Sequence, residues 1–438
     1  MEQKTPMTRF AIKDPYKYLE GLGNYHSTER ISGSSFVAPR SQNFQSWLYR
    51  ATPSLEHEEF AQLDVDTGFG QQRHSSPARN VTPNSYSWDS FPVPDGGTNW
   101  VNGQQLIGRN GDPAKKEGMA MWLFSLTEDM PERQAFSSLD GELLLIPQAG
   151  ALDVQTELGR LMVRQNEICV VPRSVRHRIT LPGGQPCRGY ICELHQGHFR
   201  LPDLGIVGST GLANVRDFQI PTAFFDGSLS DGGKVARANN SEWNIVSRLG
   251  GRLWSCTQGH TPFDVAGWHG TCYPYKYDLA RFCVLGNALF DEHDPSLFVV
   301  LTAPNYAAEP GTAVMDFAVV SPRWNVAEDT YWLPYWHRNT MQEFFGPIIS
   351  NQSPGYPFSS EKTGHRFAPF AAGLHGSMST HGATEADYQA AQKRDTHKPA
   401  KVQTDGLSIF LVETDKPLAL SDWAFNCATK NPAGRPKM

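Results

Sequence analysis

Short apolar runs separated by turn residues form the clearest pattern in the chain. Starting at Asp140, four such runs follow one another: DGELLLIPQAG (140–150), ALDVQTELGRLMV (151–163), NEICVVP (166–172) and RHRITL (176–181). Closely spaced apolar runs of this kind, bounded by Gly, Pro and Asn, are typical of antiparallel strands. The pattern therefore predicts a β-sandwich or barrel in the first half of the chain.

A second strand-rich region runs from about Arg252 toward the C-terminus. The predicted strands are FCVLGNALF (282–290), SLFVVLTA (296–303), AVMDFAVVSP (313–322), LSIFLVET (407–414) and LALSDWAF (418–425). One helix is predicted over ATEADYQAAQKRD (383–395), where helix-forming Ala, Gln, Glu and Lys are concentrated. We therefore predict an all-β protein with few helices, divided near residue 284 into an N-terminal β-sandwich domain (1–284) and a C-terminal domain (285–438).

The block after Asp140 also has the rhythm of a cupin barrel, with Gly141, Gly159, Pro172 and His177 at the expected places. A metal-binding cupin carries two closely spaced histidines and a glutamate in the first half of this motif, and this block has none. We interpret the N-terminal domain as a degenerate cupin-like scaffold, in which His177 has a structural role.

Composition and charge narrow the classes of function. The 438 residues include 39 Lys and Arg against 45 Asp and Glu, a net charge of −6. Nucleic-acid binders rely on cations that neutralise phosphates, so we expect no nucleic-acid partner. No stretch approaches about 18 apolar residues, so no membrane span is expected. A polar N-terminus and seven scattered cysteines indicate reduced thiols and a cytoplasmic location.

Candidate chemistry is concentrated in LPYWHRNTMQEFFG (333–346). His337 and Glu343 are six residues apart, and in an extended chain such residues point to the same side. One imidazole and one carboxylate make up two-thirds of the facial triad with which non-haem enzymes hold Fe(II). The segment therefore predicts part of a metal site that lacks one further histidine.

Two histidines about forty residues further on, His375 and His381, are candidates for the third ligand. Spacing alone is a weak indication, because 14 histidines in 438 residues give such pairs by chance. The clustering beside the aromatic residues Trp336, Phe344 and Phe345 favours a metal site, since apolar side chains keep open metal positions dry. The ligand types leave two metals open, the Fe(II) of an O₂-using enzyme and the zinc of a hydrolase.

Several long motifs occur in order from about residue 16 to about residue 426. They include PRSQNFQSWLYR (39–50), LPDLGIVGSTGLANVRDFQIP (201–221), GWHGTCYPYKYDL (267–279), PRWNVAEDTYWLPYWHRNTMQEFFG (322–346) and LHGSMSTHG (374–382). Together they resemble the homogentisate 1,2-dioxygenase family. The resemblance implies a non-haem Fe(II) enzyme that opens a para-dihydroxylated ring with O₂. It also implies a C-terminal cupin-like jelly-roll domain and trimers that pair into hexamers.

The resemblance further implies roles for individual residues. The iron ligands of the family match His337, Glu343 and His381. Residues near the substrate in the family match His375, Tyr335 and Asn339.

The segment that carries the family's acid–base histidine departs from the usual Asp-His-x-Asp-Pro-Ser. Here it reads FDEHDP (290–295), so the histidine stands one position later and Glu292 takes its place. On a strand, a shift of one residue turns a side chain to the other face. The acid–base candidates are therefore His293, Glu292 and His375.

The family also has a tyrosine and a lysine that bind the substrate carboxylate shortly after the ligand glutamate. Counting back from His375 gives Lys362, with Tyr356 in the loop ISNQSPGYPFSSEK (349–362). A buried carboxylate requires such partners, because burying it unpaired is costly. If Lys362 is instead a solvated surface lysine, the substrate is hydroquinone or another para-diol without an acetate group.

Three functions follow from these observations. The first is a ring-cleaving Fe(II) dioxygenase with a small aromatic substrate and O₂, which by resemblance converts homogentisate to maleylacetoacetate. The second is a zinc or nickel cupin that acts as a hydrolase or isomerase. The third is a non-catalytic binding or storage protein, which would require no intact ligand set. The intact set favours an enzyme.

Overall fold

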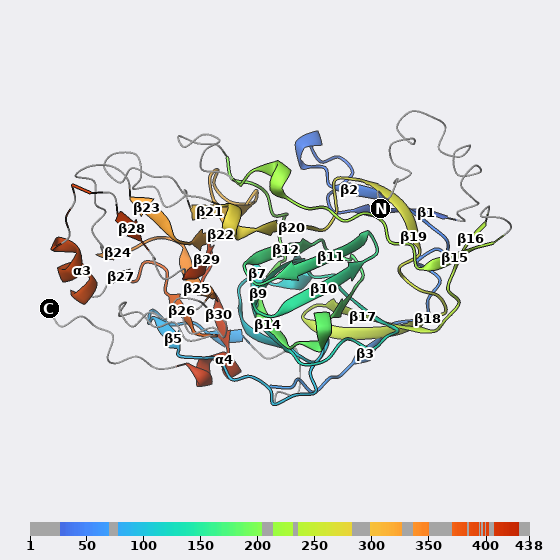
Figure 1. Cartoon of the computed structure of the whole chain (residues 1–438), viewed down its shortest axis with the longest axis horizontal. Helices are drawn as coiled ribbons and strands as arrows, with labels where there is room; N and C mark the ends of the chain where they lie inside the picture. The colour runs from blue at the N-terminus through green and yellow to red at the C-terminus, as the bar shows by residue number, and fades with distance from the viewer. Residues whose placement is uncertain are drawn as a thin grey trace.

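The computed structural model describes residues 27–69, 78–203, 213–230, 235–282, 298–325, 336–349, 370–382, 385–393, 395, 397–398, 400–402 and 407–428. The protein is all-β with few helices, as predicted, and its sheets are packed face to face (Figure 1). The α-helices of the described residues are α3 (Glu385–Gln392) and α4 (Asp422–Cys427). Their short 3₁₀ helices are η1 (Arg40–Gln42), η2 (Pro113–Lys115), η3 (Pro182–Gly184), η5 (Val215–Asp217) and η6 (Leu279–Arg281).

An eight-stranded sheet lies at the centre of the molecule and is buried on both faces. In β7, Met121 and Leu123 belong to one hydrophobic core, whereas Trp122 and Phe124 belong to another. Because both faces are covered, inner strands of this sheet such as β7 are continuous apolar runs rather than alternating ones. In spatial order the strands are β20 (Tyr275–Asp278), β12 (Glu167–Val171), β9 (Glu142–Ala149), β14 (Cys187–Leu194), β7 (Met119–Leu126), β6 (Gln104–Arg109), β30 (Ala419–Ser421) and β4 (Ala78–Asn80).

Two sheets pack on one face of the central sheet. Their apolar side chains, such as Val154, Phe136 and Trp268, share a core with that face. The seven-stranded sheet contains β11 (Gly159–Arg164), β10 (Ala151–Thr156), β13 (His177–Thr180), β8 (Gln134–Ser138), β17 (Trp243–Leu249), β18 (Arg252–Gln258) and β3 (Ala61–Leu63). The three-stranded sheet contains β1 (Ser27–Ser32), β2 (Gln45–Arg50) and β19 (Val265–Gly270).

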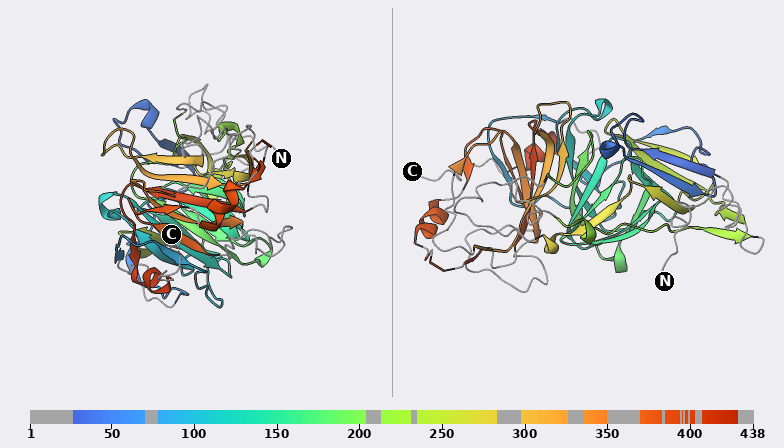
Figure 2. Two further views of the ribbon diagram at one scale, coloured as in Figure 1. Left: turned by 90° about the vertical axis from the view of Figure 1, so that its left-hand side faces the viewer. Right: turned by 90° about the horizontal axis from the view of Figure 1, so that it is seen from above.

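A six-stranded sheet packs on the other face of the central sheet, so the molecule is built in layers (Figure 2). Its strands are β21 (Val299–Pro304), β22 (Ala313–Val320), β29 (Ser408–Thr414), β25 (Gln342–Ile349), β26 (Ala372–His375) and β5 (Tyr86–Trp88). Three strand pairs complete the fold: β15 (Gly227–Ser230) with β16 (Val235–Ala238), β23 (Arg323–Asn325) with β28 (Ala400–Val402), and β24 (Trp336–His337) with β27 (His381–Gly382).

The parts of the chain before and after about residue 284, called here its two halves, exchange strands. The early strand β5 pairs with β26 in the six-stranded sheet, and the late strand β30 pairs with β6 and β4 in the central sheet. The central sheet and the six-stranded sheet therefore each contain a strand from the other part of the chain, whereas the seven-stranded sheet is built from the first part alone.

Most predicted strands correspond to observed ones. The run 151–163 turns back on itself and forms the antiparallel hairpin β10–β11. The run 296–303 overlaps β21, the runs 313–322 and 407–414 contain β22 and β29, and the predicted helix contains α3. The run 282–290 lies outside the described residues except for Phe282.

The prediction for 418–425 is wrong in its second half, where α4 replaces a strand. Strand β30 ends at Ser421, whose Oγ accepts a hydrogen bond from the Ala424 backbone N–H at 3.1 Å. A serine in this position caps the first turn of a helix. Ser421 followed by Asp422 is a sequence pattern typical of a helix start, but the apolar residues on both sides favoured a strand in our prediction.

The structure also describes six of the seven cysteines. They are free thiols, five of them buried. Within the described part of the chain, no helix has the length and apolar character that crossing a membrane requires.

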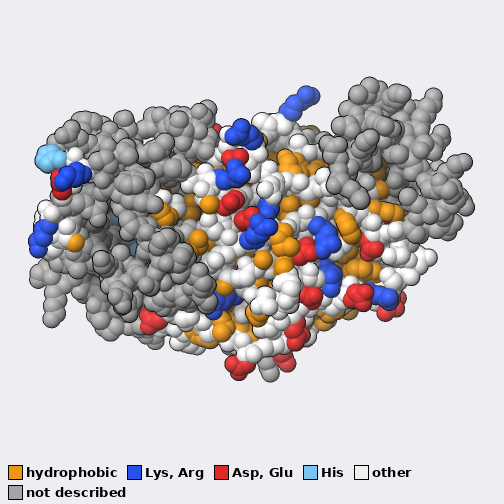
Figure 3. All heavy atoms as spheres, in the orientation of Figure 1, with side chains coloured by type: hydrophobic (Ala, Val, Ile, Leu, Met, Phe, Trp, Pro, Cys, Tyr) orange, Lys and Arg blue, Asp and Glu red, His pale blue; other side chains and the backbone are white. Residues whose placement is uncertain are grey.

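Surface charges of both signs lie among hydrophobic side chains on the face drawn in Figure 3. Ion pairs at the surface are well solvated, as in Arg79–Asp422, where the side chains are 71% and 40% exposed and the N–O distance is 3.0 Å. Such pairs stabilise a protein by at most about 1 kcal/mol.

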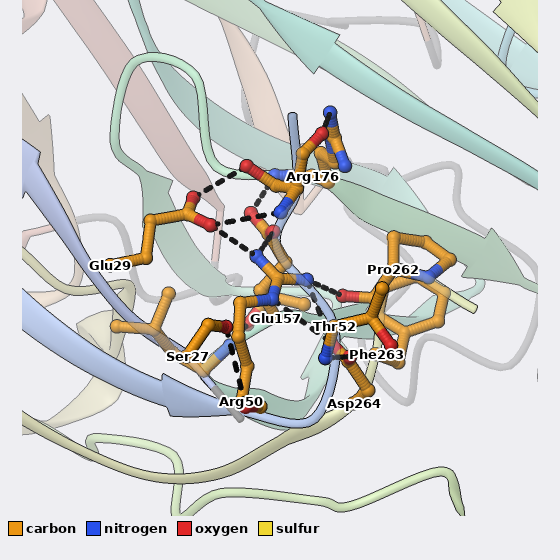
Figure 4. A network of polar contacts seen from close by, with 12 residues as sticks. Ser27, Glu29, Arg50, Thr52, Glu157, Arg176, Pro262, Phe263 and Asp264 are labelled. Carbon is orange, nitrogen blue, oxygen red and sulfur yellow. Dashed lines mark hydrogen bonds and ion pairs between the residues drawn. The ribbon is translucent and has the colours of Figure 1, made fainter. Parts of the chain in front are cut away.

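Arg50 is the centre of a buried polar network that joins three parts of the N-terminal half (Figure 4). Its fully buried guanidinium contacts Asp264 at 2.8 Å, Glu157 at 3.0 Å and the Pro262 carbonyl at 2.9 Å. It also lies 3.3 Å from the carboxylate of Glu29. Removal of one partner from such a network leaves the other charges buried and uncompensated.

We predict that Arg50→Met lowers the free energy of unfolding by about 3–5 kcal/mol, because Asp264 and Glu157 lose their buried cation. Urea unfolding followed by tryptophan fluorescence measures the change. Arg79→Met removes the exposed pair with Asp422 and is the matched control, with an expected change below about 1 kcal/mol. Equal losses in the two variants would contradict the prediction.

His177 has the structural environment that the sequence predicted. Its side chain is fully buried between the rings of Trp100 and Phe136, and its Nδ1 lies 3.1 Å from the Val175 carbonyl oxygen. Burial, with a smaller contribution from the nearby Arg248 guanidinium, lowers the pKa of His177 to about 4, although the contact with the Val175 carbonyl opposes the change. The ring is therefore neutral at physiological pH.

We predict that His177 makes the protein sensitive to acid. The unfolded chain binds a proton at this histidine below about pH 6.5, whereas the folded chain does so only near pH 4. Stability is therefore lost as the pH falls between these values, by about 3 kcal/mol in total. Urea unfolding at pH 7 and pH 4.5 measures how much of the free energy of unfolding is lost on acidification. This loss should be smaller in His177→Phe than in the wild type. It should equal the wild-type loss in His57→Gln, a control at an exposed position.

Candidate metal centre

The candidate site lies on the face of the six-stranded sheet that points away from the core. Along β25, Phe344 packs inward against Trp88 and Phe410, with ring centroids 6.1 Å apart in both pairs. Glu343 and Phe345 alternate with it and therefore point to the opposite face. Of the predicted aromatic shell, Phe345 lies near the site and Phe344 belongs to the core.

Three side chains come together on this outer face. The candidate ligand atoms of His337, Glu343 and His381 all lie within 4.8 Å of one another. His337 Nε2 is 3.4 Å from Glu343 Oε1, and His381 Nε2 is 3.1 Å from Glu343 Oε2. The side chains of Glu343 and His381 are only 10% and 5% exposed, whereas His337 is 34% exposed. The group is thus open to solvent mainly beside His337.

The reason for this convergence differs from the one that the sequence suggested. We expected His337 and Glu343 to share one face of a single strand, and this is wrong. The chain leaves β24 after His337 and starts β25 at Gln342, in a different sheet. His337 is instead paired directly with His381 across β24 and β27, with ring centroids 4.3 Å apart.

The turns on either side of the site are joined by hydrogen bonds. The backbone N–H of Met378 donates to the Asn339 carbonyl at 2.8 Å, and Ser377 Oγ donates to the Thr340 carbonyl at 2.6 Å. Met378 adopts a left-handed conformation with φ of 56°, which turns the chain between β26 and β27. These contacts fix the two strand pairs relative to each other.

His375 is a fourth polar residue at the site. It stands opposite Glu343 in the β25–β26 register, and its Nδ1 is 3.3 Å from Glu343 Oε2. Its ring stacks on His381, with centroids 4.1 Å apart. Burial lowers the pKa of His375, although contact with Glu343 opposes the change.

Gly373 makes room for the aromatic wall beside His375. Phe345 stands opposite Gly373 in the register, and a Cβ atom at position 373 would overlap its ring. Because the glycine has no side chain, the ring extends across it and reaches His375, with centroids 4.8 Å apart. A larger residue at position 373 would displace the Phe345 ring from His375.

Carboxylates form a row that crosses three strands of the sheet. Glu343 stands opposite Glu413 of β29, and Glu413 stands opposite Asp316 of β22. Burial, with Glu343 and Asp316 nearby, raises the pKa of Glu413 to about 7. Burial alone would also raise the pKa of Glu343, but contacts with His375 and His381 outweigh it and hold that pKa below its usual range.

The arrangement suits a divalent cation. Two imidazole nitrogens and one carboxylate oxygen are ligands for non-haem Fe(II) or for zinc. Ligands about 2.1 Å from a metal and at right angles to each other lie about 3 Å apart, close to the separations of 3.1 and 3.4 Å. Within the described residues, the buried Nε2 of His381 has no hydrogen bond of regular geometry, and a cation would satisfy it.

Family comparisons cover almost the whole chain. Two family models, for the N-terminal and C-terminal parts of homogentisate 1,2-dioxygenase, match residues 17–279 and 280–433. A homogentisate 1,2-dioxygenase of Emericella nidulans is 42% identical over 97% of this chain and 94% of its own length. The protein belongs to the homogentisate 1,2-dioxygenase family. Its Caenorhabditis elegans relative of the same name is 38% identical over 94% of each chain.

Solved structures similar to this chain share little of its sequence. YlbA of E. coli is 10% identical and matches 78% of this chain and 96% of its own, with a TM-score of 0.31. A cupin 2 conserved barrel domain protein of Leptotrichia buccalis is 9% identical and matches 71% and 88%, with a TM-score of 0.26.

Membership of the homogentisate 1,2-dioxygenase family makes this chain an enzyme, an oxidoreductase of the ring-cleaving kind. Of its predicted site residues, the structure describes His337, Asn339, Glu343, His375 and His381, and brings all five together. The other predicted site residues lie outside the described residues: Glu292, His293, Tyr335, Tyr356 and Lys362.

Glu413 is a polar residue of the site that the sequence did not suggest. It is 70 positions from Glu343 along the chain and belongs to no short motif with it. The alternating burial of β29 could have indicated only which side of the strand Glu413 is on. Ile409, Leu411 and Glu413 are partly buried and alternate with fully buried neighbours. From the sequence, a carboxylate on this side of a strand would be expected to face solvent. Its position next to a metal ligand would not be expected.

Proposed function

We propose that this protein is a non-haem Fe(II) dioxygenase that opens the ring of homogentisate with O₂ and forms maleylacetoacetate. The observation that carries the proposal is the convergence of His337, Glu343 and His381 within 4.8 Å, in a chain of this family. The proposed metal ligands are these three side chains. Relatives named homogentisate 1,2-dioxygenase support the choice of substrate.

The proposed ligand set suits oxygen chemistry. Two neutral imidazoles and one carboxylate would leave a ferrous ion with a net charge near +1. His337, Glu343 and His381 would hold the ion from one side, and the ion would supply binding positions for a phenolate oxygen and O₂. The protein holds both reactants in one place, and this removes much of the entropic cost of their encounter.

His375 is the described residue with the best position to move a proton. Its ring stacks on His381 and is mostly buried beside Phe345. Because burial lowers its pKa, the imidazole is neutral near pH 7 and can accept the proton of a substrate phenol. By resemblance, His293 and Glu292 are the other proposed acid–base residues.

The proposed substrate-binding residues are Tyr335, Asn339, Tyr356 and Lys362. Among the described residues, Asn339 Oδ1 is buried and has no hydrogen-bond partner. A buried acceptor without a partner is costly, and a substrate hydroxyl would satisfy it. The family resemblance supports the other three.

The wider proposals also rest on the family. We propose that the chain divides near residue 284, close to the point where the two family models meet. The C-terminal cupin-like unit then carries the catalytic residues. We further propose a cytoplasmic homo-oligomer, a trimer or hexamer, whose partners are a small aromatic substrate and O₂.

We predict that anaerobic reconstitution with Fe(II) gives one iron per chain and rapid O₂ uptake with homogentisate, but little with hydroquinone or gentisate. His337→Ala and His381→Ala should lose bound iron and reduce the rate by at least about 100-fold, because each removes one of three ligands. The exposed-site variant His57→Ala is the control and should retain both. Activity with zinc alone would refute the oxygenase proposal, and uptake restricted to hydroquinone would refute the substrate.

We predict that Lys362→Met raises KM for homogentisate by about 10-fold or more and leaves KM for hydroquinone within about 2-fold, because only homogentisate has a carboxylate to pair. Steady-state O₂ uptake with both compounds measures the split. Lys393→Met, on the exposed surface after α3, is the control. Equal changes for the two substrates would show that Lys362 does not bind the carboxylate.

A further inference from the structure

Asn339 connects the parts of the site that belong to different sheets. Its backbone carbonyl accepts a hydrogen bond from Met378, in the turn between His375 and His381. Its side-chain Nδ2 donates to Glu343 Oε1 at 2.5 Å. Asn339 is also only two residues from His337. One residue thus contacts, or directly adjoins, every segment that supplies a candidate ligand.

Glu413 is the second acceptor for the same amide. Asn339 Nδ2 is 3.4 Å from Glu413 Oε1, a long hydrogen bond from the neighbouring strand β29. With a carboxylate on each side of it, the amino group of Asn339 faces the sheet. The amide oxygen is then directed away from both acids, as its lack of a partner within the described residues indicates.

The position of Glu413 has no evident benefit for the stability of the sheet. It stands directly opposite Glu343 on one side and Asp316 on the other. Like charges directly opposite each other on neighbouring strands are destabilising. Within the described residues, the hydrogen bond from Asn339 is the only one that the Glu413 carboxylate accepts. A residue that costs stability and bonds to a ligand-holding amide points to a role in the site.

We propose that Glu413 is a positioning residue of the metal centre, which holds the Asn339 amide so that the amide in turn holds Glu343 in its ligating orientation. The inference rests on the proposed function only in taking Glu343 as a metal ligand. Outer residues of this kind orient the ligands, and their removal weakens metal binding by about 10–100-fold.

A double-mutant cycle tests the proposal, because Glu413 is inferred to act through Asn339. The four proteins are the wild type, Glu413→Met, Asn339→Ala and the double variant. Fe(II) affinity is measured anaerobically by competition with a chromogenic chelator, and the visible spectrum of Co(II)-loaded protein reports the ligand geometry. Thermal unfolding of the metal-free proteins shows whether each variant is folded.

We expect each single variant to bind Fe(II) about 10–100-fold more weakly and to change the Co(II) spectrum. The double variant should bind no more weakly than Asn339→Ala alone. Glu413→Gln keeps the length and one acceptor oxygen, so its affinity should stay within about 3-fold of the wild type. Glu309→Gln, at an exposed position before β22, is the control and should leave affinity and spectrum unchanged.

Two results would overturn the proposal. One is an Fe(II) affinity in Glu413→Met equal to that of the wild type. The other is an additive cycle, in which Glu413→Met has the same effect with and without Asn339. If Glu413→Met does not fold, Glu413→Asp shortens the side chain by one methylene and should weaken binding in its place. A wild type that binds iron but does not consume O₂ with homogentisate would refute the proposed function, while the cycle still decides the role of Glu413.

Discussion

The site depends on one carboxylate that is largely withdrawn from water. Glu343 is 10% exposed and lies within 3.4 Å of nitrogen atoms from His337, His375 and His381. An ionised carboxylate in such a place is costly unless cations or hydrogen-bond donors surround it. Here the surrounding groups come from two different sheets. The Glu343 carboxylate requires polar partners, and two of them are His337 of β24 and His381 of β27. This requirement favours close packing of β24 and β27 against β25.

The layered architecture explains why polar groups can gather on this sheet. Most of the fully buried apolar side chains of the six-stranded sheet lie on one face, in the core that it shares with the central sheet. Its outer face is therefore free to carry Glu343, His375, Glu413 and Asp316 without breaking a hydrophobic layer. In the N-terminal half, where a sheet of similar size faces a second core, the corresponding interior holds the buried and neutral His177.

From the sequence we predicted which residues lie in the candidate metal centre, but not how the strands bring them together. His337, Glu343 and His381 were identified from residue type and resemblance, but the argument from strand alternation was wrong because a turn separates the first two. Spacing along a chain does not show where a strand ends. Helix α4 was missed for a related reason, since the apolar pattern continued through the serine that caps it. Glu413 could not be predicted, because only the pairing of β25 with β29 brings it near Glu343.

The exchange of strands between the two halves has a consequence for synthesis of the protein on the ribosome. The outer edge of β6 is covered by β30, which consists of residues 419–421 and also supplies the partner of β4. Until the six-stranded sheet and residues 419–421 have been made, the central sheet has an unpaired edge and one bare apolar face. Open edges and bare apolar faces are where growing chains adhere to one another. We therefore expect the growing chain to be prone to association until β30 has been made, and we expect neither half to be a self-sufficient folding unit.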